Sequence, residues 1–266
     1  MKNIKLIVKT KSKNYPIYFG NNILHTTGIL IKKNIPNVKK VCIITDIKIP
    51  NIFLKVLIKS LKSFDVKIYK LSVSEKTKSL NVANKIIEKL LKENFNRSDC
   101  VIAFGGGIVG DLSSFVSSVI KRGVGFVNIP TTLLAQSDAS VGGKTGINSI
   151  HGKNLIGTFY QPDFVLTDIS ILKSLPHREM ICGYGEILKH SLIDNKKLFL
   201  WLCRHGKNII KNKDKNIIKK AIVASCKIKS QIVKKDEREK SLRMILNFGH
   251  TFAHGFEGAK KFSKKI

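Results

Sequence analysis

Acidic residues are scarce in this sequence: 18 aspartates and glutamates stand against 48 lysines and arginines, which gives the 266-residue chain a formal net charge of +30. Arginine is also scarce, so the excess is almost entirely lysine, spread along the chain among isoleucine, asparagine and leucine. A nucleic-acid-binding domain more often gathers arginine and lysine on one face beside aromatic residues. We therefore predict that nucleic acid is not the partner, whereas the positive field should attract small anions.

Long apolar runs, cysteine pairs and low-complexity tracts are absent as well. No run approaches the roughly 20 apolar residues of a membrane helix, and the N-terminal segment lacks the continuous apolar stretch of a secretory signal. The five cysteines are widely spaced and include no Cys-x-x-Cys pair, a pattern typical of reduced thiols. These absences exclude a disordered, fibrous or membrane-spanning chain and predict a globular protein of the cytoplasm.

Short apolar runs alternate with amphipathic segments through residues 1–168. Strands are expected at 4–8, 41–45, 66–73, 100–104 and 124–130, and helices at 51–63, 81–95 and 111–123. Because strands that alternate with helices form βαβ units, this half is predicted to be a Rossmann-like α/β domain with a parallel sheet. Residues 169–266 have almost entirely helical periodicity. An all-α domain is therefore expected to follow, with a ligand site in the cleft between the two.

The segment Gly105-Gly106-Gly107-Ile108-Val109-Gly110-Asp111 lies between an expected strand and an expected helix and has the spacing G-x-G-x-x-G. Glycines allow the backbone to approach a pyrophosphate, and the helix N-terminus offers free N–H groups and the positive end of the dipole. However, the segment follows two earlier βα units, and Arg122 stands where an ordinary dinucleotide site has an acid. We predict dinucleotide binding in a variant arrangement; the alternative is a tight turn without a ligand.

Residues 128–157 are predicted to form a long loop. They contain paired threonines, Asp138, and Lys144 and Lys153 among glycines. Glycine beside lysine suits an anion that backbone and ammonium approach together. Since loops of this length without a function are uncommon in compact domains, the segment predicts a phosphate or carboxylate site.

Ionisable pairs on the expected helices indicate a metal site. His250 and His254 are four residues apart and share a helix face, as do Glu186 and Lys189 on another helix. Zinc takes nitrogen and oxygen ligands of this kind in tetrahedral geometry. The residues alone leave metal binding and a structural role equally open, with His250 and His254 as equal candidates.

Five longer segments go beyond single motifs: GGGIVGD, IPTTLLAQSDASVGGKTGIN, GKNLIGTFYQP, LPHREMICGYGEILKH and DEREKSLRMILNFGHTFAHGFE. In this order they resemble the 3-dehydroquinate synthase family of sugar-phosphate cyclases, over almost the whole chain. The resemblance implies conversion of 3-deoxy-D-arabino-heptulosonate 7-phosphate to 3-dehydroquinate with release of phosphate, a step of the shikimate pathway to aromatic amino acids. It also implies catalytic NAD⁺, a zinc or cobalt ion, and a homodimer.

The resemblance further implies roles for individual residues. Glu186 and His250 would bind the metal, and His254 would instead face the substrate. The substrate-side residues would be Lys144, Asn154, Lys189, Lys229, Arg243, Asn247, His254 and Arg122, the last acting on the partner subunit's site. The residues that hold NAD⁺ would be Asp46, Val73, Ser74, Glu75, Lys76, Thr77, Lys78, Gly106, Gly107, Ile108, Val109, Gly110, Asp111, Thr131, Thr132, Asp138, Lys144, Lys153, Ile171, Leu172, Lys173 and Ser174.

One departure from the family pattern bears on activity. Members of the family continue into an HGE-type motif whose histidine is the third zinc ligand, whereas this sequence ends at Ile266. The helical domain is therefore expected to be incomplete, and a metal held by Glu186 and His250 alone should bind weakly. Four hypotheses remain open: an active synthase with a substitute ligand such as His254 or with a part supplied elsewhere, a catalytically impaired fragment, a sibling cyclase or glycerol-dehydrogenase-type enzyme, and a nucleic-acid binder.

Overall fold

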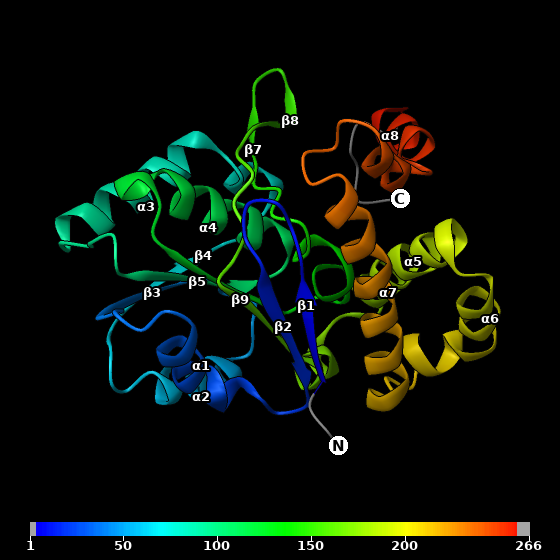
Figure 1. Cartoon of the computed structure of the whole chain (residues 1–266), viewed down its shortest axis with the longest axis horizontal. Coiled ribbons are helices and arrows are strands. Elements are labelled where there is room, and N and C mark those ends of the chain that lie inside the picture. Colours follow the sequence, from blue (N-terminus) through cyan, green and yellow to red (C-terminus); the bar gives the residue numbers. More distant parts are fainter. Residues whose placement is uncertain (1–3, 260–266) are drawn as a thin grey trace.

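A seven-stranded sheet forms the centre of the computed structural model, which describes residues 4–259 apart from the side chains of residues 254 and 257–259. The strand order is β1-β2-β9-β6-β5-β3-β4, and every neighbouring pair is parallel except β1 with β2 (Figure 1). The strands are β1 (Ile4–Val8), β2 (Tyr15–Gly20), β3 (Lys40–Asp46), β4 (Asp65–Leu71), β5 (Cys100–Gly105), β6 (Gly125–Pro130) and β9 (Phe164–Asp168). The predicted α/β fold with a parallel sheet is thus confirmed.

Helices cover both faces of the sheet, which explains why its central strands are apolar along their whole length. The helices are α1 (Thr27–Asn34) and α2 (Asn51–Ser60) on one face, and α3 (Leu80–Lys92) and α4 (Gly107–Val119) on the other (Figure 1). Each pair of helices shares a separate hydrophobic cluster with the sheet. All six residues of β5 are buried, as expected for a strand between two helical layers.

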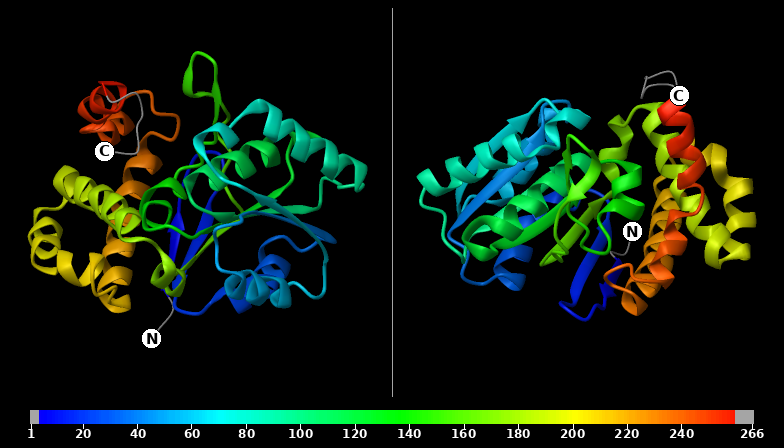
Figure 2. Two further views of the ribbon diagram at one scale, coloured as in Figure 1. Left: turned by 180° about the vertical axis from the view of Figure 1, so that it is seen from behind. Right: turned by 90° about the horizontal axis from the view of Figure 1, so that it is seen from above.

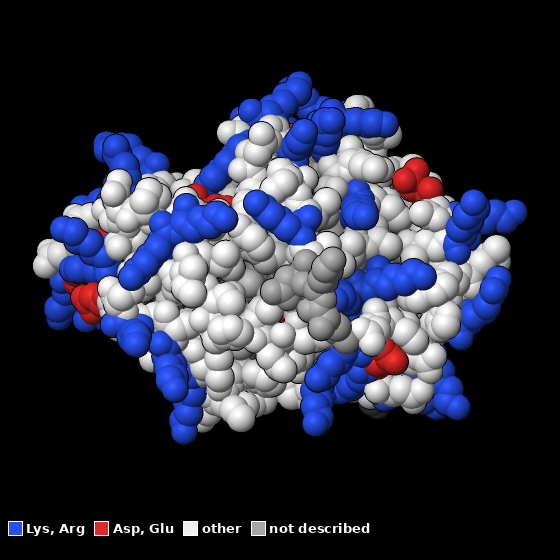
Figure 3. Space-filling view, turned by 60° about the horizontal axis from the view of Figure 1, so that its bottom comes forward, with Lys and Arg blue, Asp and Glu red and all other residues white. Residues whose placement is uncertain are grey.

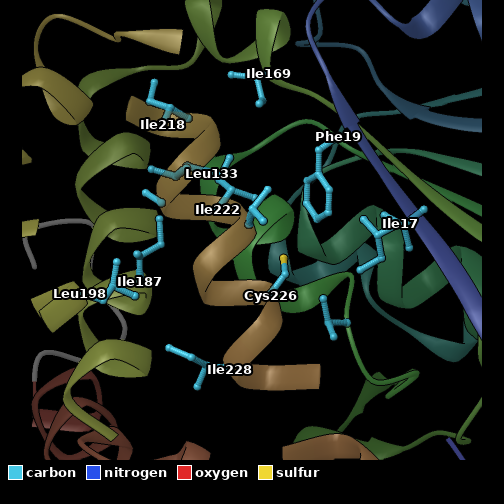
Figure 4. Close-up of a cluster of buried hydrophobic side chains, with 14 of the residues drawn as sticks. Ile17, Phe19, Leu133, Ile169, Ile187, Leu198, Ile218, Ile222, Cys226 and Ile228 are labelled. Atoms are coloured by element: carbon cyan, nitrogen blue, oxygen red, sulfur yellow. The ribbon is translucent and has the colours of Figure 1, made fainter. Parts of the chain in front are cut away.

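The rest of the chain is helical and packs beside the sheet (Figure 2). Its elements are η5 (Ile169–Ser174), α5 (His177–Asp194), α6 (Lys196–Ile210), α7 (Lys215–Lys235), η6 (Leu242–Asn247) and α8 (His250–Ala259). Side chains of α7 such as Ile222 and Cys226 share one hydrophobic cluster with Ile17 and Phe19 of β2 (Figure 4). Within residues 4–259, none of the helices has both the length and the apolar character that crossing a membrane requires.

Two segments differ from the sequence-based expectation. The single helix expected over residues 241–257 is interrupted between η6 and α8, because Gly249 adopts a φ of +82°, which a continuing helix does not allow. The expected loop at 128–157 contains a one-turn π-helix, η4 (Ala135–Ala139), and a hairpin of β7 (Ile147–Ser149) and β8 (Gly152–Ile156). The hairpin is held by contacts distant in sequence, with Lys78 and Ser79, which periodicity does not reveal.

Candidate functional site

The carboxyl ends of the central strands meet at one edge of the sheet. β3 ends at Asp46, β5 at Gly105 and β6 at Pro130, which is followed by the buried Thr131 and by Thr132. In open α/β sheets, ligands bind outside the carboxyl ends of the strands. The residues predicted from the sequence to hold a nucleotide therefore begin at the edge where the fold places a ligand.

The glycine-rich segment forms the junction between β5 and α4. A Cβ atom at Gly105 would lie 2.5 Å from the side chain of Val109, and one at Gly106 would lie 3.1 Å from that of Thr132. At Gly107, the first residue of α4, a Cβ would meet nothing nearer than Ala139 at 3.8 Å. The missing side chain therefore leaves open space in front of a helix N-terminus, where N–H groups lack intrahelical partners.

Residues 73–78 lie against this helix. Glu75–Thr77 form the short helix η2, and the buried Lys78 side chain pairs with Asp111 of α4 and also donates to Asn154 of the hairpin. Burial raises the pKa of the Asp111 carboxyl, against the opposing effect of the Lys78 ammonium. Three segments far apart in sequence are thereby joined beside the glycine-rich turn.

A cavity of about 600 Å³ lies between the sheet edge and the helical part of the chain, within the size range of small-molecule sites. Most of the residues expected on the substrate side line it. These are Lys144, Asn154, Lys189, Lys229, Arg243 and Asn247, and they are joined by the expected metal ligand His250 and by Asp111 and Asp138 from the expected nucleotide set. The concentration of cations suits a ligand with phosphate and carboxylate groups.

Lys144 and Glu239 form an ion pair at this cavity. Glu239 also accepts a hydrogen bond of 2.9 Å from Asn247 Nδ2. Burial, together with the nearby cations Arg243 and Lys229, lowers the pKa of Lys144 to about 8. Lys144 is therefore a cation whose charge changes close to neutral pH.

Glu186 and His250 come together from α5 and α8. Glu186 Oε1 lies 3.7 Å from His250 Nε2, and two ligands of one tetrahedral zinc ion lie about 3.4 Å apart when each bond is about 2.1 Å. Lys189 Nζ contacts both groups, at 2.5 Å from Glu186 Oε2 and 3.3 Å from His250 Nε2. The donor pair fits a divalent metal, provided that the Lys189 ammonium turns aside when the ion binds.

Asp138 lies next to this pair, on η4. Its Oδ1 is 2.7 Å from Lys229 Nζ and 3.1 Å from Nε2 of the fully buried His190. Although burial opposes ionisation, Lys229 and His190 hold the pKa of the Asp138 carboxyl well below its usual value. Asp138, Glu186 and His190 each offer one ligand atom within 4.8 Å of the others, so Glu186 could also share a metal with them.

Some expected site residues lie elsewhere. Arg122 and Lys153 are exposed and do not line the cavity. Ile171 and Leu172 of η5 point into the hydrophobic core, 2% and 1% exposed, while Lys173 and Ser174 face the surface. The side chain of His254 lies outside the described residues, so its expected place beside the substrate stays a prediction.

Two polar residues of the site were not assigned from the sequence. Glu239 stands within the quoted segment DEREKSLRMILN, and His190 follows Lys189 directly. Because His190 is four residues after Glu186, the helix places both on one face, which is the signal that could have identified it. Glu239 carried no such signal, since its loop is positioned by tertiary contacts.

The fold and the site define a class of protein. A solved 2-deoxy-scyllo-inosose synthase in complex with carbaglucose-6-phosphate, NAD⁺ and Co²⁺ is similar to this chain, with a TM-score of 0.86 and 25% identity over 97% of this chain and 70% of that one. The fold is also that of a 2-epi-5-epi-valiolone synthase from Streptomyces hygroscopicus bound to NAD⁺ and Zn²⁺, with a TM-score of 0.85 and 24% identity over 97% and 71% of the two chains. The fold is therefore that of the sugar-phosphate cyclases.

Sequence comparison identifies the family within this class. Residues 68–182 match the 3-dehydroquinate synthase N-terminal family and residues 183–265 the 3-dehydroquinate synthase C-terminal family. The 3-dehydroquinate synthase of Pelagibacter ubique is 51% identical over 99% of this chain and 71% of its own length, and that of Bartonella tribocorum is 41% identical over 97% and 70%. The chain belongs to the 3-dehydroquinate synthase family.

Proposed function

We propose that this protein converts 3-deoxy-D-arabino-heptulosonate 7-phosphate to 3-dehydroquinate and phosphate. The observation that carries the proposal is the convergence of Lys144, Lys189, Lys229 and Arg243 on one cavity beside the glycine-rich turn and the Glu186–His250 pair. A substrate with a phosphate and a carboxylate needs several cations, and its oxidation needs a hydride acceptor held close by.

The nucleotide would bind across the carboxyl ends of β3, β5 and β6. The open space at Gly107 fits a pyrophosphate at the N-terminus of α4. Asp46 and the segment 73–78 would then hold the adenosine side, with Thr131 and Thr132 near the nicotinamide. NAD⁺ is supported as the cofactor by the two cyclase structures, which are described with it.

Glu186 and His250 would hold the metal ion, zinc or cobalt. When bound, NAD⁺ accepts a hydride and the metal polarises the substrate oxygen at which oxidation occurs. The side chains do the remaining work: Lys144, Lys229 and Arg243 bind the anionic groups, while Asp138 and Asn154 accept hydrogen bonds from hydroxyls. Closure of the cavity by the hairpin and by α8 would keep water away from the reacting carbon.

A sibling cyclase activity is the second candidate, because the structural relatives include an inosose synthase and a valiolone synthase. The cation set favours the heptulosonate phosphate, which carries a carboxylate in addition to the phosphate. Supplying either the heptulosonate phosphate or glucose 6-phosphate, and identifying the product by mass spectrometry, separates the two.

The proposal includes a cytoplasmic location and a homodimeric assembly. All five cysteines are free thiols, which supports the cytoplasm as the location. Arg122 is exposed and lies away from the cavity of its own subunit, which supports a homodimer in which it acts on the partner subunit's site.

The test is a phosphate-release assay with the heptulosonate phosphate, NAD⁺ and Zn²⁺. We expect release that a chelator abolishes and that Glu186→Ala reduces to background, because that variant removes a metal ligand. Glu179→Ala, which removes an exposed carboxylate from the same helix, should leave the rate unchanged. Binding of NAD⁺ without any release by the wild-type chain would instead establish a catalytically impaired member of the family.

A further inference from the structure

The carboxylate of Asp138 is held by side chains from two different helices. Lys229 of α7 and His190 of α5 both contact Oδ1, at 2.7 and 3.1 Å, and Lys229 Nζ also donates to the backbone oxygen of Asp138 at 2.9 Å. Because the side-chain contacts found among the described residues end on one oxygen, they fix the rotation of the carboxylate. The other oxygen, Oδ2, is then the one available to a ligand in the cavity that Asp138 lines.

His190 is itself held by a contact on the side of the ring away from Asp138. Its Nδ1 lies 2.6 Å from Ser225 Oγ on α7, and Ser225 Oγ lies 3.4 Å from the backbone oxygen of Ser137. Because the Asp138 carboxylate faces Nε2, it favours the tautomer with the ring proton on Nε2, and the Ser225 hydroxyl then donates to Nδ1 in place of Ser137. The approach of Nε2 to Oδ1 is an electrostatic contact off the line of the N–H bond rather than an aligned hydrogen bond.

Because His190 and Ser225 are buried, loss of their contacts cannot be compensated by solvent. The side chains of His190 and Ser225 are both 0% exposed, so water cannot replace the ring if it is removed. The alternative role for His190 is that of a metal ligand together with Asp138 and Glu186. An ion shared by these three residues would have to displace Lys229 from Asp138 as well as Lys189 from Glu186, whereas the Glu186–His250 pair requires only Lys189 to move.

We propose that His190, fixed by Ser225, is a positioning residue that orients the Asp138 carboxylate so that Oδ2 meets a hydroxyl of the sugar phosphate. The identity of the substrate in this inference rests on the proposed function. The contacts among Ser225, His190 and Asp138 do not depend on it. The proposal adds to the site a residue that touches neither substrate nor cofactor and acts only through Asp138.

The decisive variants are His190→Leu, which keeps the bulk and removes both polar contacts, and His190→Gln, which restores an amide donor near the place of Nε2. We expect His190→Leu to lower kcat/KM about 10- to 100-fold, by analogy with the loss caused by removing the partners that orient metal-binding side chains. His190→Gln should recover most of the loss, and Ser225→Ala should show a smaller one. NAD⁺ affinity, bound zinc and Tm of His190→Gln should stay at wild-type values.

Two controls make the result specific. His205→Gln, a change to a histidine whose ring lies tilted against Trp201 of α6, should leave kcat/KM unchanged. In the Asp138→Ala background, His190→Leu should cause no further loss, because the group it orients is already gone. Additive losses, or a wild-type kcat/KM in His190→Leu, would overturn the proposal, and so would a loss of zinc equal to that of Glu186→Ala.

A readout without turnover separates this inference from the proposed function. Crystal structures of the two variants should differ. The Asp138 carboxylate should be rotated in His190→Leu and should keep its wild-type orientation in His190→Gln. An unrotated carboxylate in His190→Leu contradicts the positioning role, even if the wild-type chain releases no phosphate. Absence of phosphate release alone contradicts only the proposed reaction.

Discussion

Lys144 shows how the surroundings of one residue can set its chemistry. Its side chain is half exposed, yet burial of the rest and the cations Arg243 and Lys229 lower its pKa to about 8. The ion pair with Glu239 opposes that shift because it favours the charged form. The charge of Lys144, and with it the affinity for anions, therefore depends on its neighbours and on pH.

At the residue scale we predict that anion binding weakens as the pH rises through about 8. Lys144 is charged below its pKa, so KM for the heptulosonate phosphate should rise about tenfold per pH unit above that value. Glu239→Gln removes the opposing carboxylate and should move this rise to lower pH. Lys144→Arg stays charged throughout and should abolish it; a rise that persists in the arginine variant would assign the titration to another group.

At the scale of elements, Asp168 joins the end of the sheet to the helical part. This fully buried residue ends β9, and its carboxylate accepts hydrogen bonds from the backbone N–H groups of Asn22, Ile23, Leu24 and Ser170 and from the Ser170 hydroxyl. It thereby caps η5 and also holds the short helix η1 (Leu24–Thr26) against the sheet. One carboxylate satisfies buried N–H groups of two separate segments.

We predict that Asp168→Asn destabilises the fold by about 3 kcal/mol. The amide places an N–H where the acid had an acceptor, so buried backbone donors lose their partner and the charge-assisted bonds are lost. The free energy of unfolding from urea denaturation measures the effect. Asp194→Asn, an equivalent change of an exposed residue at the end of α5, should stay within about 0.5 kcal/mol of the wild type.

At the scale of the whole molecule, the helical part and the sheet are packed as one body. The cluster around Ile17, Phe19 and Ile222 spans β2 and α7, and Glu237, in the loop after α7, accepts hydrogen bonds from Ser12 and Gln161. On the face shown in Figure 3, lysine and arginine side chains are scattered over the face and along its edges rather than gathered in one stripe. That nucleic acid is not the partner of this lysine-rich chain stays a prediction from the sequence.

We predict that two inactive variants restore activity when combined. If Arg122 acts on the partner subunit's site, a heterodimer of Arg122→Ala and Glu186→Ala contains one complete site. Co-expression in equal amounts should then recover about a quarter of the wild-type rate of phosphate release, since half the dimers are mixed and each has one working site. No recovery would place Arg122 in its own subunit's site or outside any site, and Lys121→Ala, a change to the exposed neighbour, serves as the control.

Local signals in the sequence determined the elements and the class of the fold. Short, β-branched apolar runs such as residues 41–45 and 100–104 alternate with amphipathic helical segments, so a parallel sheet buried between helices could be predicted. The glycine-rich segment and the motifs shared with the family likewise placed the nucleotide and substrate residues along the chain. The domain boundary at residue 168 and the roles of the site residues stay predictions, because no observation tests them.

Tertiary structure alone decided which side chains meet. His190 and Asp138 are 52 positions apart and Lys144 and Glu239 are 95 apart, and no periodicity in the sequence relates such pairs. The hairpin of β7 and β8 likewise depends on distant contacts, with Lys78 and Ser79, whereas the break at Gly249 lies at a residue that itself disfavours a helix. Local preference acts between near neighbours and therefore determines helices and strands, whereas a site depends on distances that exist only once those elements have packed.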